Sequence, residues 1–182
     1  MSEAWDGPWL RCARHALSPY QDERPSGTQV DLLVLHAISL PPEQFGTGEV
    51  PRFFQGNLDF SAHPYYASLR DLHVSAHFFI ERDGQLWQHV PVDRRAWHAG
   101  VSIWQGRERC NDFSVGIEIE GTATQAFADV QYAVLQGLIF ALWSYFPDLD
   151  RRAIAGHAEI APGRKWDPGP HFDWQRLWQG LG

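Results

Sequence analysis

The chain has 182 residues and a formal net charge of −7, with 15 Lys and Arg against 22 Asp and Glu. This length is enough for one domain with a buried core, and a content of 44% hydrophobic and 20% charged residues excludes a disordered chain. The acidic balance argues against nucleic-acid binding, which needs clustered Lys and Arg, and 2 Cys exclude a disulfide framework or a cysteine-rich zinc site. The 9 His are the unusual feature, because imidazoles supply metal sites and proton-transfer sites.

The chain carries no segment that is typical of export or of membrane insertion. Its first residues, MSEAWD, lack the basic and apolar regions of a secretory signal. Its longest apolar stretch, residues 132–146, is interrupted by polar residues and is shorter than the roughly 20 residues that a membrane helix needs. We therefore expect a cytoplasmic protein without contact to a membrane, with Cys12 and Cys110 as reduced thiols.

In the first part of the chain, two loops flank a buried strand. Residues 18–28 and 40–51 are rich in Pro, Gly and polar residues and are predicted to be surface loops. Asp31–His36 (DLLVLH) lies between them and has the apolar run of a buried strand. Phe53–Phe54 and Pro64–Arg70 are candidates for short helices before the next strand.

The middle of the chain predicts a hairpin and a further strand. Ser75–Glu81 and Gln85–Val90 are strand candidates joined by Asp83-Gly84, which is a strong hairpin signal. Ser114–Glu120 (SVGIEIE) alternates Val and Ile with Gly and Glu, which is the period of two that a strand shows. Its two glutamates are therefore expected together on one face, opposite an apolar face.

The last part of the chain predicts a long helix that runs from about Asp129 to Phe146 and stops at Pro147. Its apolar residues form one stripe, which consists of Leu135, Leu138, Ile139, Leu142 and Phe146. A short strand at Ala153–Gly156 and a closing helix at Asp173–Gln179 follow. These elements predict an α/β or mixed α+β fold, with a single domain in which helices flank a central mixed β-sheet.

Two histidines and one carboxylate are the strongest candidates for chemistry. His36 and His157 each lie where a predicted strand ends, and Asp167 lies in a loop stiffened by three Pro and two Gly within residues 161–171. Two His and one carboxylate suit a catalytic zinc ion, which takes three protein ligands and keeps one position for water. Taken singly, each histidine can equally be a core residue held by one hydrogen bond.

Four further residues are candidates with plain structural alternatives. Glu118 can serve as a general base for a metal-activated water, and Lys165 can stabilise an oxyanion, but both are also explained as solvated charges. Trp97 can stack on a sugar or belong to the core, and Arg109 can bind a carboxylate or form a surface ion pair. The other histidines, apart from His98 beside Trp97, are treated as structural or surface residues: His15, His63, His73, His77, His89 and His171.

Several longer segments together resemble one known family. They include LVLH, VSAHFFI, RAWHAGVS, GRERCNDFSVGIEIEGT and the loop RK-x-DPGP, and they span about residues 30–178. From them the chain is identified as similar to the AmpD-type 1,6-anhydro-N-acetylmuramyl-L-alanine amidases, within the wider group of zinc amidases that includes peptidoglycan recognition proteins. The resemblance implies one zinc amidase domain over residues 1–182, with a central mixed sheet and flanking helices.

The resemblance also implies a reaction and the residues that carry it. A member of this family is a zinc hydrolase that cuts the amide between the muramyl lactyl group and L-alanine in recycled cell-wall fragments. The positions that match the Zn²⁺ ligands are His36, His157 and Asp167. Glu118 matches the catalytic glutamate, and Lys165 matches the lysine near the scissile carbonyl.

For the substrate, the resemblance implies a muropeptide. We also expect a monomer, with no nucleic acid or membrane as partner. Arg109 matches an arginine that meets peptide carboxylates, and Trp97 matches a residue that lines the muropeptide groove. Two positions depart from the family pattern, because Ala37 replaces the usual Asn and His73 replaces a usual Arg. Both departures concern substrate contacts, so affinity or stem preference is expected to differ while hydrolysis is retained.

Three other interpretations stay open at this point. The chain can be a non-catalytic peptidoglycan-binding protein on the same fold, although such proteins typically lack a ligand. A zinc peptidase or deacetylase that acts on another amide is not excluded by the two His and one Asp alone, but the long motif match argues against it. It can also hold a purely structural zinc ion, for which Cys110 is the one attractive fourth ligand.

Overall fold

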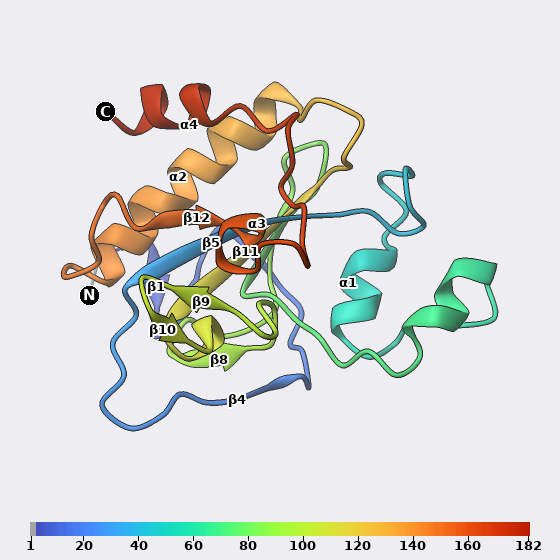
Figure 1. Ribbon diagram of the computed structural model, residues 1–182, viewed down its shortest axis with the longest axis horizontal. Helices are drawn as coiled ribbons and strands as arrows, with labels where there is room; N and C mark the ends of the chain where they lie inside the picture. Colours follow the sequence, from blue (N-terminus) through green and yellow to red (C-terminus); the bar gives the residue numbers. More distant parts are fainter. Residues whose placement is uncertain (1–2) are drawn as a thin grey trace.

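The computed structural model describes residues 3–182 and is built around a six-stranded sheet with the order β12-β5-β11-β6-β7-β3 (Figure 1). Its strands are β3 (Arg14–His15), β5 (Leu32–Ile38), β6 (Phe78–Ile80), β7 (Leu86–Gln88), β11 (Ser114–Glu120) and β12 (Ile154–Gly156). The pair β6–β7 is antiparallel, and all other neighbours in this sheet are parallel. The predicted mixed sheet and the predicted hairpin at Asp83-Gly84 are therefore confirmed.

Two helices cover one face of this sheet. The long helix α2 (Asp129–Tyr145) crosses it, and α4 (Trp174–Leu181) lies beside α2 (Figure 1). The predicted stripe is confirmed over its helical part, since Leu135, Leu138, Ile139 and Leu142 are all buried in the main core. Phe146 is the residue that caps the end of α2 and is only partly buried. This burial explains why the central strands carry apolar side chains on the face that the helices cover.

A second, smaller core lies at the other end of the molecule, around α1 (Glu49–Phe54) and the 3₁₀ helix η1 (Pro64–Leu69). Figure 1 shows both elements to one side of the main sheet. The two predicted short helices are therefore present, but residues 40–51 are not wholly loop, because α1 already begins at Glu49. The apolar side chains of α1 pack against Leu40 and Phe79. These contacts are made outside the segment, so its Pro and Gly content does not predict them.

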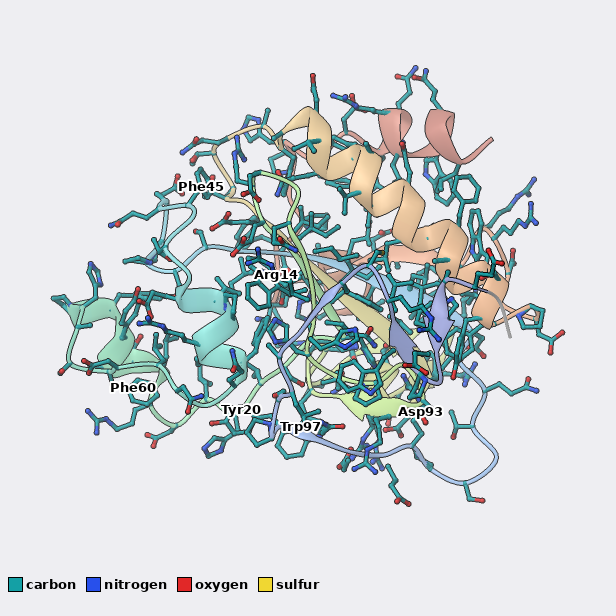
Figure 2. All side chains as sticks on the ribbon, turned by 180° about the vertical axis from the view of Figure 1, so that it is seen from behind. Arg14, Tyr20, Phe45, Phe60, Asp93 and Trp97 are labelled. Atoms are coloured by element: carbon teal, nitrogen blue, oxygen red, sulfur yellow. The ribbon has the colours of Figure 1, made fainter. Side chains whose placement is uncertain are left out.

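The predicted loop at residues 18–28 also contains a strand. β4 (Gln21–Glu23) pairs antiparallel with β8 (Arg94–Ala96), and Asp22 accepts two hydrogen bonds from Arg95, at 2.5 and 2.6 Å. The partner lies more than seventy positions away in the sequence, so the polar composition of the segment gives no sign of it. Tyr20 and Trp97, at the ends of these two strands, stack with ring centroids 6.3 Å apart and lie side by side in Figure 2.

The remaining elements are short. They are β1 (Trp5–Asp6), β2 (Trp9–Leu10), β9 (Ile103–Trp104), β10 (Arg107–Glu108), the 3₁₀ helix η2 (Cys110–Asp112) and α3 (His157–Ile160). The segment GRERCN of the long family motif supplies β10 and the start of η2. In residues 3–182, no helix is both long and apolar enough to cross a membrane.

Candidate metal centre

The register of the parallel strands brings the distant candidate residues together. β11 lies beside β5 with Glu118 directly opposite His36, and β12 lies on the other side of β5 with Gly156 opposite Leu35. His157 follows β12 at once, so it emerges next to His36 although 121 positions separate them in the sequence. Carboxyl ends of parallel strands meet at one edge of a sheet, where ligands usually bind.

A cleft of about 660 Å³ opens at this edge. Its walls include Glu118, Lys165 and Trp97, together with both positions that depart from the family pattern, Ala37 and His73. The volume is in the range of sites for small organic ligands. The cleft therefore unites the candidate catalytic residues with the aromatic candidate for substrate binding.

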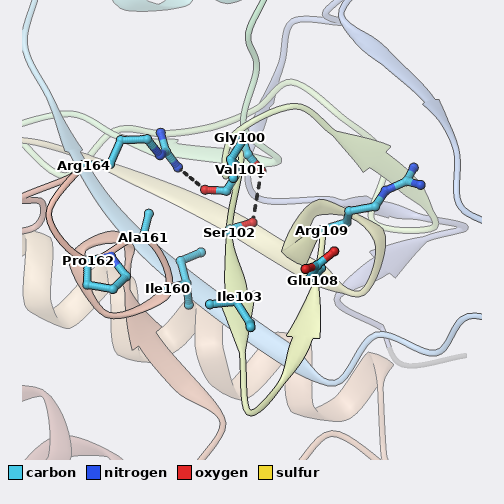
Figure 3. A pocket seen from close by; sticks show the side chains of 10 residues that line it. All are labelled: Gly100, Val101, Ser102, Ile103, Glu108, Arg109, Ile160, Ala161, Pro162 and Arg164. Atoms are coloured by element: carbon cyan, nitrogen blue, oxygen red, sulfur yellow. Dashed lines mark hydrogen bonds between the residues drawn. The ribbon is translucent and has the colours of Figure 1, made fainter.

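Arg109 does not line this cleft. It lies in a neighbouring pocket of about 630 Å³ that shares Gly100 and Arg164 with the cleft (Figure 3). Its side chain is largely exposed and pairs with Asp112 at 3.3 Å. Sequence reasoning placed it with the substrate site, but the structure puts it one pocket away from the metal-ligating group.

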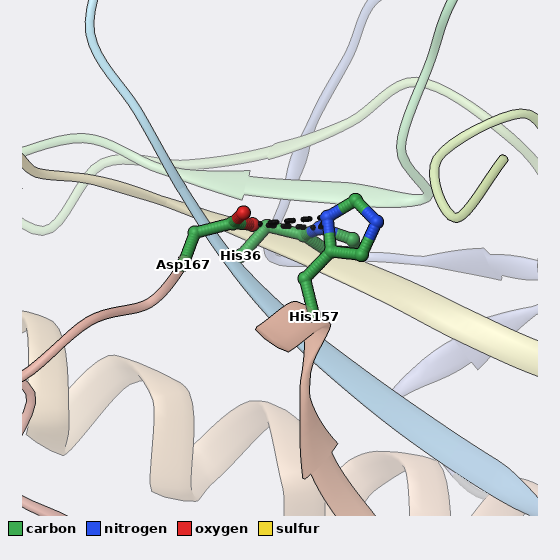
Figure 4. A group of neighbouring side chains, drawn as sticks. All are labelled: His36, His157 and Asp167. Carbon is green, nitrogen blue, oxygen red and sulfur yellow. Dashed lines mark hydrogen bonds and ion pairs between the residues drawn. The ribbon is translucent and has the colours of Figure 1, made fainter. Parts of the chain in front are cut away.

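The three candidate ligands converge on one point (Figure 4). The Nδ1 atoms of His36 and His157 are 2.9 Å apart, and Asp167 Oδ2 lies 3.2 Å from the first and 3.1 Å from the second. All three residues are buried. Two imidazole nitrogens and a carboxylate oxygen at such distances repel each other through their lone pairs unless a proton or a cation lies between them. Nitrogen and oxygen donors in this number fit a zinc ion with an open position.

The loop that carries Asp167 is held against α3 and β12. The backbone N–H of Ala158 donates to the carbonyl oxygen of Asp167 at 2.9 Å, which ties the loop to the turn after His157. A Cβ atom on Gly156 would lie 2.9 Å from Pro168 Cδ, so glycine is needed for this close approach. The proline-rich loop thus fixes the carboxylate relative to both histidines.

Burial and hydrogen bonding set the protonation states that metal ligands need. Burial lowers the pKa of His36 from 6.5 to about 4, so this imidazole stays neutral at pH 7. Burial alone would raise the pKa of Asp167, but the hydrogen bonds from His157 and His36 outweigh it and lower that pKa below 3.8. Neutral imidazoles and a charged carboxylate are the forms that bind a divalent metal.

Glu118 and Glu120 share one face of β11 but have different surroundings. Glu118 Oε2 is buried and has no hydrogen-bond partner in the described part of the chain. Burial, reinforced by the charge of Asp167, raises the pKa of Glu118 well above 4.5, and the charge of Lys165 partly offsets this. Glu120 instead accepts the backbone N–H groups of Gly46 and Arg82, at 2.7 and 2.8 Å. The polar face of this strand is therefore covered by the protein and is not a solvent-facing edge.

Sequence reasoning missed two contributions to the site. His98 is buried, and its Nδ1 atom lies 2.9 Å from Nε2 of His36, on the side of the ring away from Asp167. Tyr20 joins the aromatic wall, since its ring lies 5.0 Å from that of His73 and also stacks on Trp97. The sequence places His98 beside Trp97, but nothing local shows which partner His98 meets.

Cys110 is not a fourth ligand in this structure. Its side chain is buried in the main apolar core, and over residues 3–182 the group that can hold a metal consists of His36, His157 and Asp167 alone. A closed structural zinc site normally has four protein ligands, whereas a catalytic site keeps one position open. The geometry therefore argues for the catalytic type.

Comparison with known proteins gives a consistent result. The family model for N-acetylmuramoyl-L-alanine amidase (Amidase_2) matches residues 26–170. The 1,6-anhydro-N-acetylmuramyl-L-alanine amidase AmpD of Escherichia coli (strain K12) is 53% identical over 169 residues, which cover 93% of this chain and 92% of that protein.

Solved structures agree with this match. The crystal structure of a Se-Met AmpD derivative has a TM-score of 0.94 at 51% identity and covers 97% of this chain and 98% of that chain. The complex of the E. coli amidase AmiD with anhydro-N-acetylmuramic acid-L-Ala-D-gamma-Glu-L-Lys has a TM-score of 0.61 at 30% identity and covers 87% of this chain and 60% of that chain. The family match spans the complete metal-ligating group. The chain belongs to the N-acetylmuramoyl-L-alanine amidase family and is an amidase of the AmpD type.

Proposed function

We propose that this amidase is a zinc enzyme that hydrolyses the bond between 1,6-anhydro-N-acetylmuramic acid and L-alanine in muropeptides during cytoplasmic peptidoglycan recycling. The observation that carries the proposal is the convergence of His36 Nδ1, His157 Nδ1 and Asp167 Oδ2, buried and within 4.8 Å of one another, beside the unpartnered carboxylate oxygen of Glu118. Relatives support the substrate, because AmiD is described in complex with an anhydro-muramyl peptide.

In this proposal His36, His157 and Asp167 hold the zinc ion. Zinc bound at such a site lowers the pKa of a water molecule to about 7 and polarises a carbonyl oxygen. Glu118 takes the proton from the attacking water, because its Oε2 atom has no competing partner among the described residues and its raised pKa suits a general base. The same carboxyl group then delivers the proton to the amine of L-alanine as the amide bond breaks.

Lys165 and Trp97 act on the substrate from the walls of the same cleft. The ammonium group of Lys165 stabilises the negative oxygen of the tetrahedral intermediate, and one such contact is typically worth roughly 3–4 kcal/mol. Trp97 offers a ring face to the muropeptide. Arg109, in the adjacent pocket, is available to carboxylates of a longer stem peptide that extends beyond Gly100. The chain is proposed to act as a monomer and as one domain over residues 1–182.

The alternative of a non-catalytic binding protein has no observation in its favour. Glu118, Lys165, His157 and Asp167 line a single cleft, and His36 lies 2.9 Å from His157 and 3.2 Å from Asp167. A protein that only binds peptidoglycan has no need for a buried, unpartnered carboxylate, which costs folding free energy.

Mass spectrometry of products tests the proposal. Purified protein is incubated with anhydro-muropeptides and with intact muropeptides, each with and without a chelator, and then with zinc restored. We expect free stem peptide from anhydro-muropeptides, loss of that product with chelator, and recovery with zinc. Peptide release that is insensitive to chelation, or no release at all, would refute the proposed zinc chemistry. The intact-muropeptide arm measures how strictly the anhydro end is required.

A further inference from the structure

One short segment after β8 touches both histidines of the candidate metal centre. His98 Nδ1 lies 2.9 Å from His36 Nε2, and the carbonyl oxygen of Ala99 lies 3.1 Å from His157 Nε2. Each contact is made to the ring nitrogen that faces away from Asp167. Two adjacent residues therefore reach the outer side of both imidazoles.

The proton on each imidazole decides whether its other nitrogen can bind a metal. A neutral ring carries one proton, so a metal on Nδ1 requires the proton to be on Nε2. The carbonyl of Ala99 can only accept, and at 3.1 Å it lies closer to His157 Nε2 than the donor Arg164 Nη2 at 3.5 Å, so it favours this tautomer for His157. His36 is almost fully buried, and within residues 3–182 His98 Nδ1 is the one group that hydrogen-bonds its Nε2 atom.

We propose that His98 is a positioning residue for the metal centre. Its Nδ1 atom accepts the Nε2–H of His36, and this bond keeps His36 Nδ1 free and oriented for the metal. His98 then carries its proton on Nε2 and donates it to Ser114 Oγ at 3.2 Å. The chain of donors runs from His36 through His98 to Ser114. This inference rests on the proposed metal site but adds a residue outside the ligand set.

The surroundings of His98 hold it in place for this contact. Asn111 Oδ1 accepts the backbone N–H groups of His98 and Ala99, at 3.1 and 2.8 Å, and so clamps the segment. The ring packs on β11 at Gly116, where an added Cβ would lie 2.4 Å from His98 Cγ. Glycine at position 116 thus leaves the space that the imidazole fills, which is the kind of support an oriented metal ligand needs.

His77 provides a matched contrast. It is equally buried, and its ring lies 5.9 Å from that of His98. Its Nδ1 accepts the N–H of Gly116 at 3.0 Å, and its Nε2 lies 3.0 Å from both the carbonyl oxygen of Arg94 and Nη2 of Arg24. None of these three contacts reaches a candidate ligand. His77 is thus a buried histidine with a purely structural role.

The test measures zinc affinity by competition with a chromophoric chelator for the wild-type protein and for His98→Leu, His98→Asn and His77→Asn. His98→Leu removes the acceptor, and we expect zinc affinity to fall about 10–100-fold. Asparagine at position 98 keeps an acceptor oxygen where Nδ1 was, so His98→Asn should retain most of the affinity. His77→Asn should lower the unfolding temperature and leave zinc affinity unchanged.

Long-range ¹H–¹⁵N spectra of the zinc-loaded wild-type protein give a second readout. They should show the proton on Nε2 of both His36 and His98, whereas a proton on Nδ1 of His98 would overturn the proposal. Zinc affinity of His98→Leu equal to that of the wild type, with only the unfolding temperature lowered, would also overturn it, as would equal weakening in both His98 variants. If the wild-type protein binds no zinc, the proposed function itself fails. If the wild-type protein binds zinc but the variants or the spectra give one of these contrary results, only the role of His98 fails.

Discussion

Glu118 and Glu120 lie two positions apart on the same face of β11, yet we expect their replacement by glutamine to affect different properties. Glu118 is proposed to move protons, and its Oε2 atom has no partner in the described structure. Glu120 ties two loops to the strand through the backbone N–H groups of Gly46 and Arg82. One substitution should therefore remove activity, and the other should remove stability.

For Glu118→Gln, the expected loss is that of a general base. Such groups contribute typically about 10²–10⁴-fold to the rate, which corresponds to roughly 3–5 kcal/mol of transition-state stabilisation. The fold should not suffer, because no hydrogen bond of Oε2 is lost. Burial raises the pKa of this carboxyl, which means that its charged form is costly in the folded state at pH 7. Without zinc, the variant should therefore unfold at a temperature equal to or higher than that of the zinc-free wild type.

For Glu120→Gln, the amide keeps one acceptor oxygen and turns an NH₂ group toward the second backbone N–H. The variant loses one of the two hydrogen bonds, at 2.7 and 2.8 Å, together with the charge that strengthens both. A hydrogen bond to a charged group contributes about 1.5–3 kcal/mol. In a chain of this size that loss lowers the unfolding temperature by roughly 3–12 °C. The rate at saturating substrate should stay near that of the wild type.

Both variants are assayed side by side for kcat/KM on an anhydro-muropeptide, for zinc content and for the unfolding temperature. Full activity in zinc-loaded Glu118→Gln would refute the general-base assignment. The structural reasoning would fail if Glu120→Gln lost activity at an unchanged unfolding temperature. Because the two side chains share one strand and one face, each variant controls for nonspecific damage in the other.

Two further predictions concern metal and pH. Removing the metal with a chelator should lower the unfolding temperature, because the donor atoms of His36, His157 and Asp167 then face each other at 2.9–3.2 Å without a cation; thermal unfolding with and without added zinc checks this, and identical curves would contradict it. His89 lies away from this group, and burial lowers its pKa from 6.5 to about 4. The unfolded chain takes up this proton first as the pH falls below 6.5, so stability drops, by about 2 kcal/mol between pH 7 and pH 5. His89→Asn keeps a donor toward the carbonyl oxygen of Ala16 but cannot titrate. Urea unfolding of this variant at pH 7 and pH 5 should show a free energy of unfolding that depends less on pH than that of the wild type. An unchanged pH dependence would contradict the role of His89.

The sequence alone determined those features that depend on local pattern. Alternation in Ser114–Glu120 predicted a strand with the bounds that the structure has, and the apolar stripe with Pro147 predicted the long helix to within one residue at its end. Period and breaker residues act within a few positions of the chain, so one sequence suffices to read them. The long motifs around Arg109 and Asp167 similarly identified the family that the comparisons show.

The tertiary structure decided which of the candidate residues work together. His36 and Glu118 meet because β5 and β11 pair in a particular register, and parallel partners are joined by long connections that leave no local signal. The alternating pattern predicted that Glu118 and Glu120 share one face, but it did not distinguish their roles. The structure distinguishes them, because two backbone N–H groups donate hydrogen bonds to Glu120. His98 looked like one of many histidines until the fold set it against His36. Local periodicity fixes which way a side chain points, but its partner is set by contacts between segments that are distant in the chain.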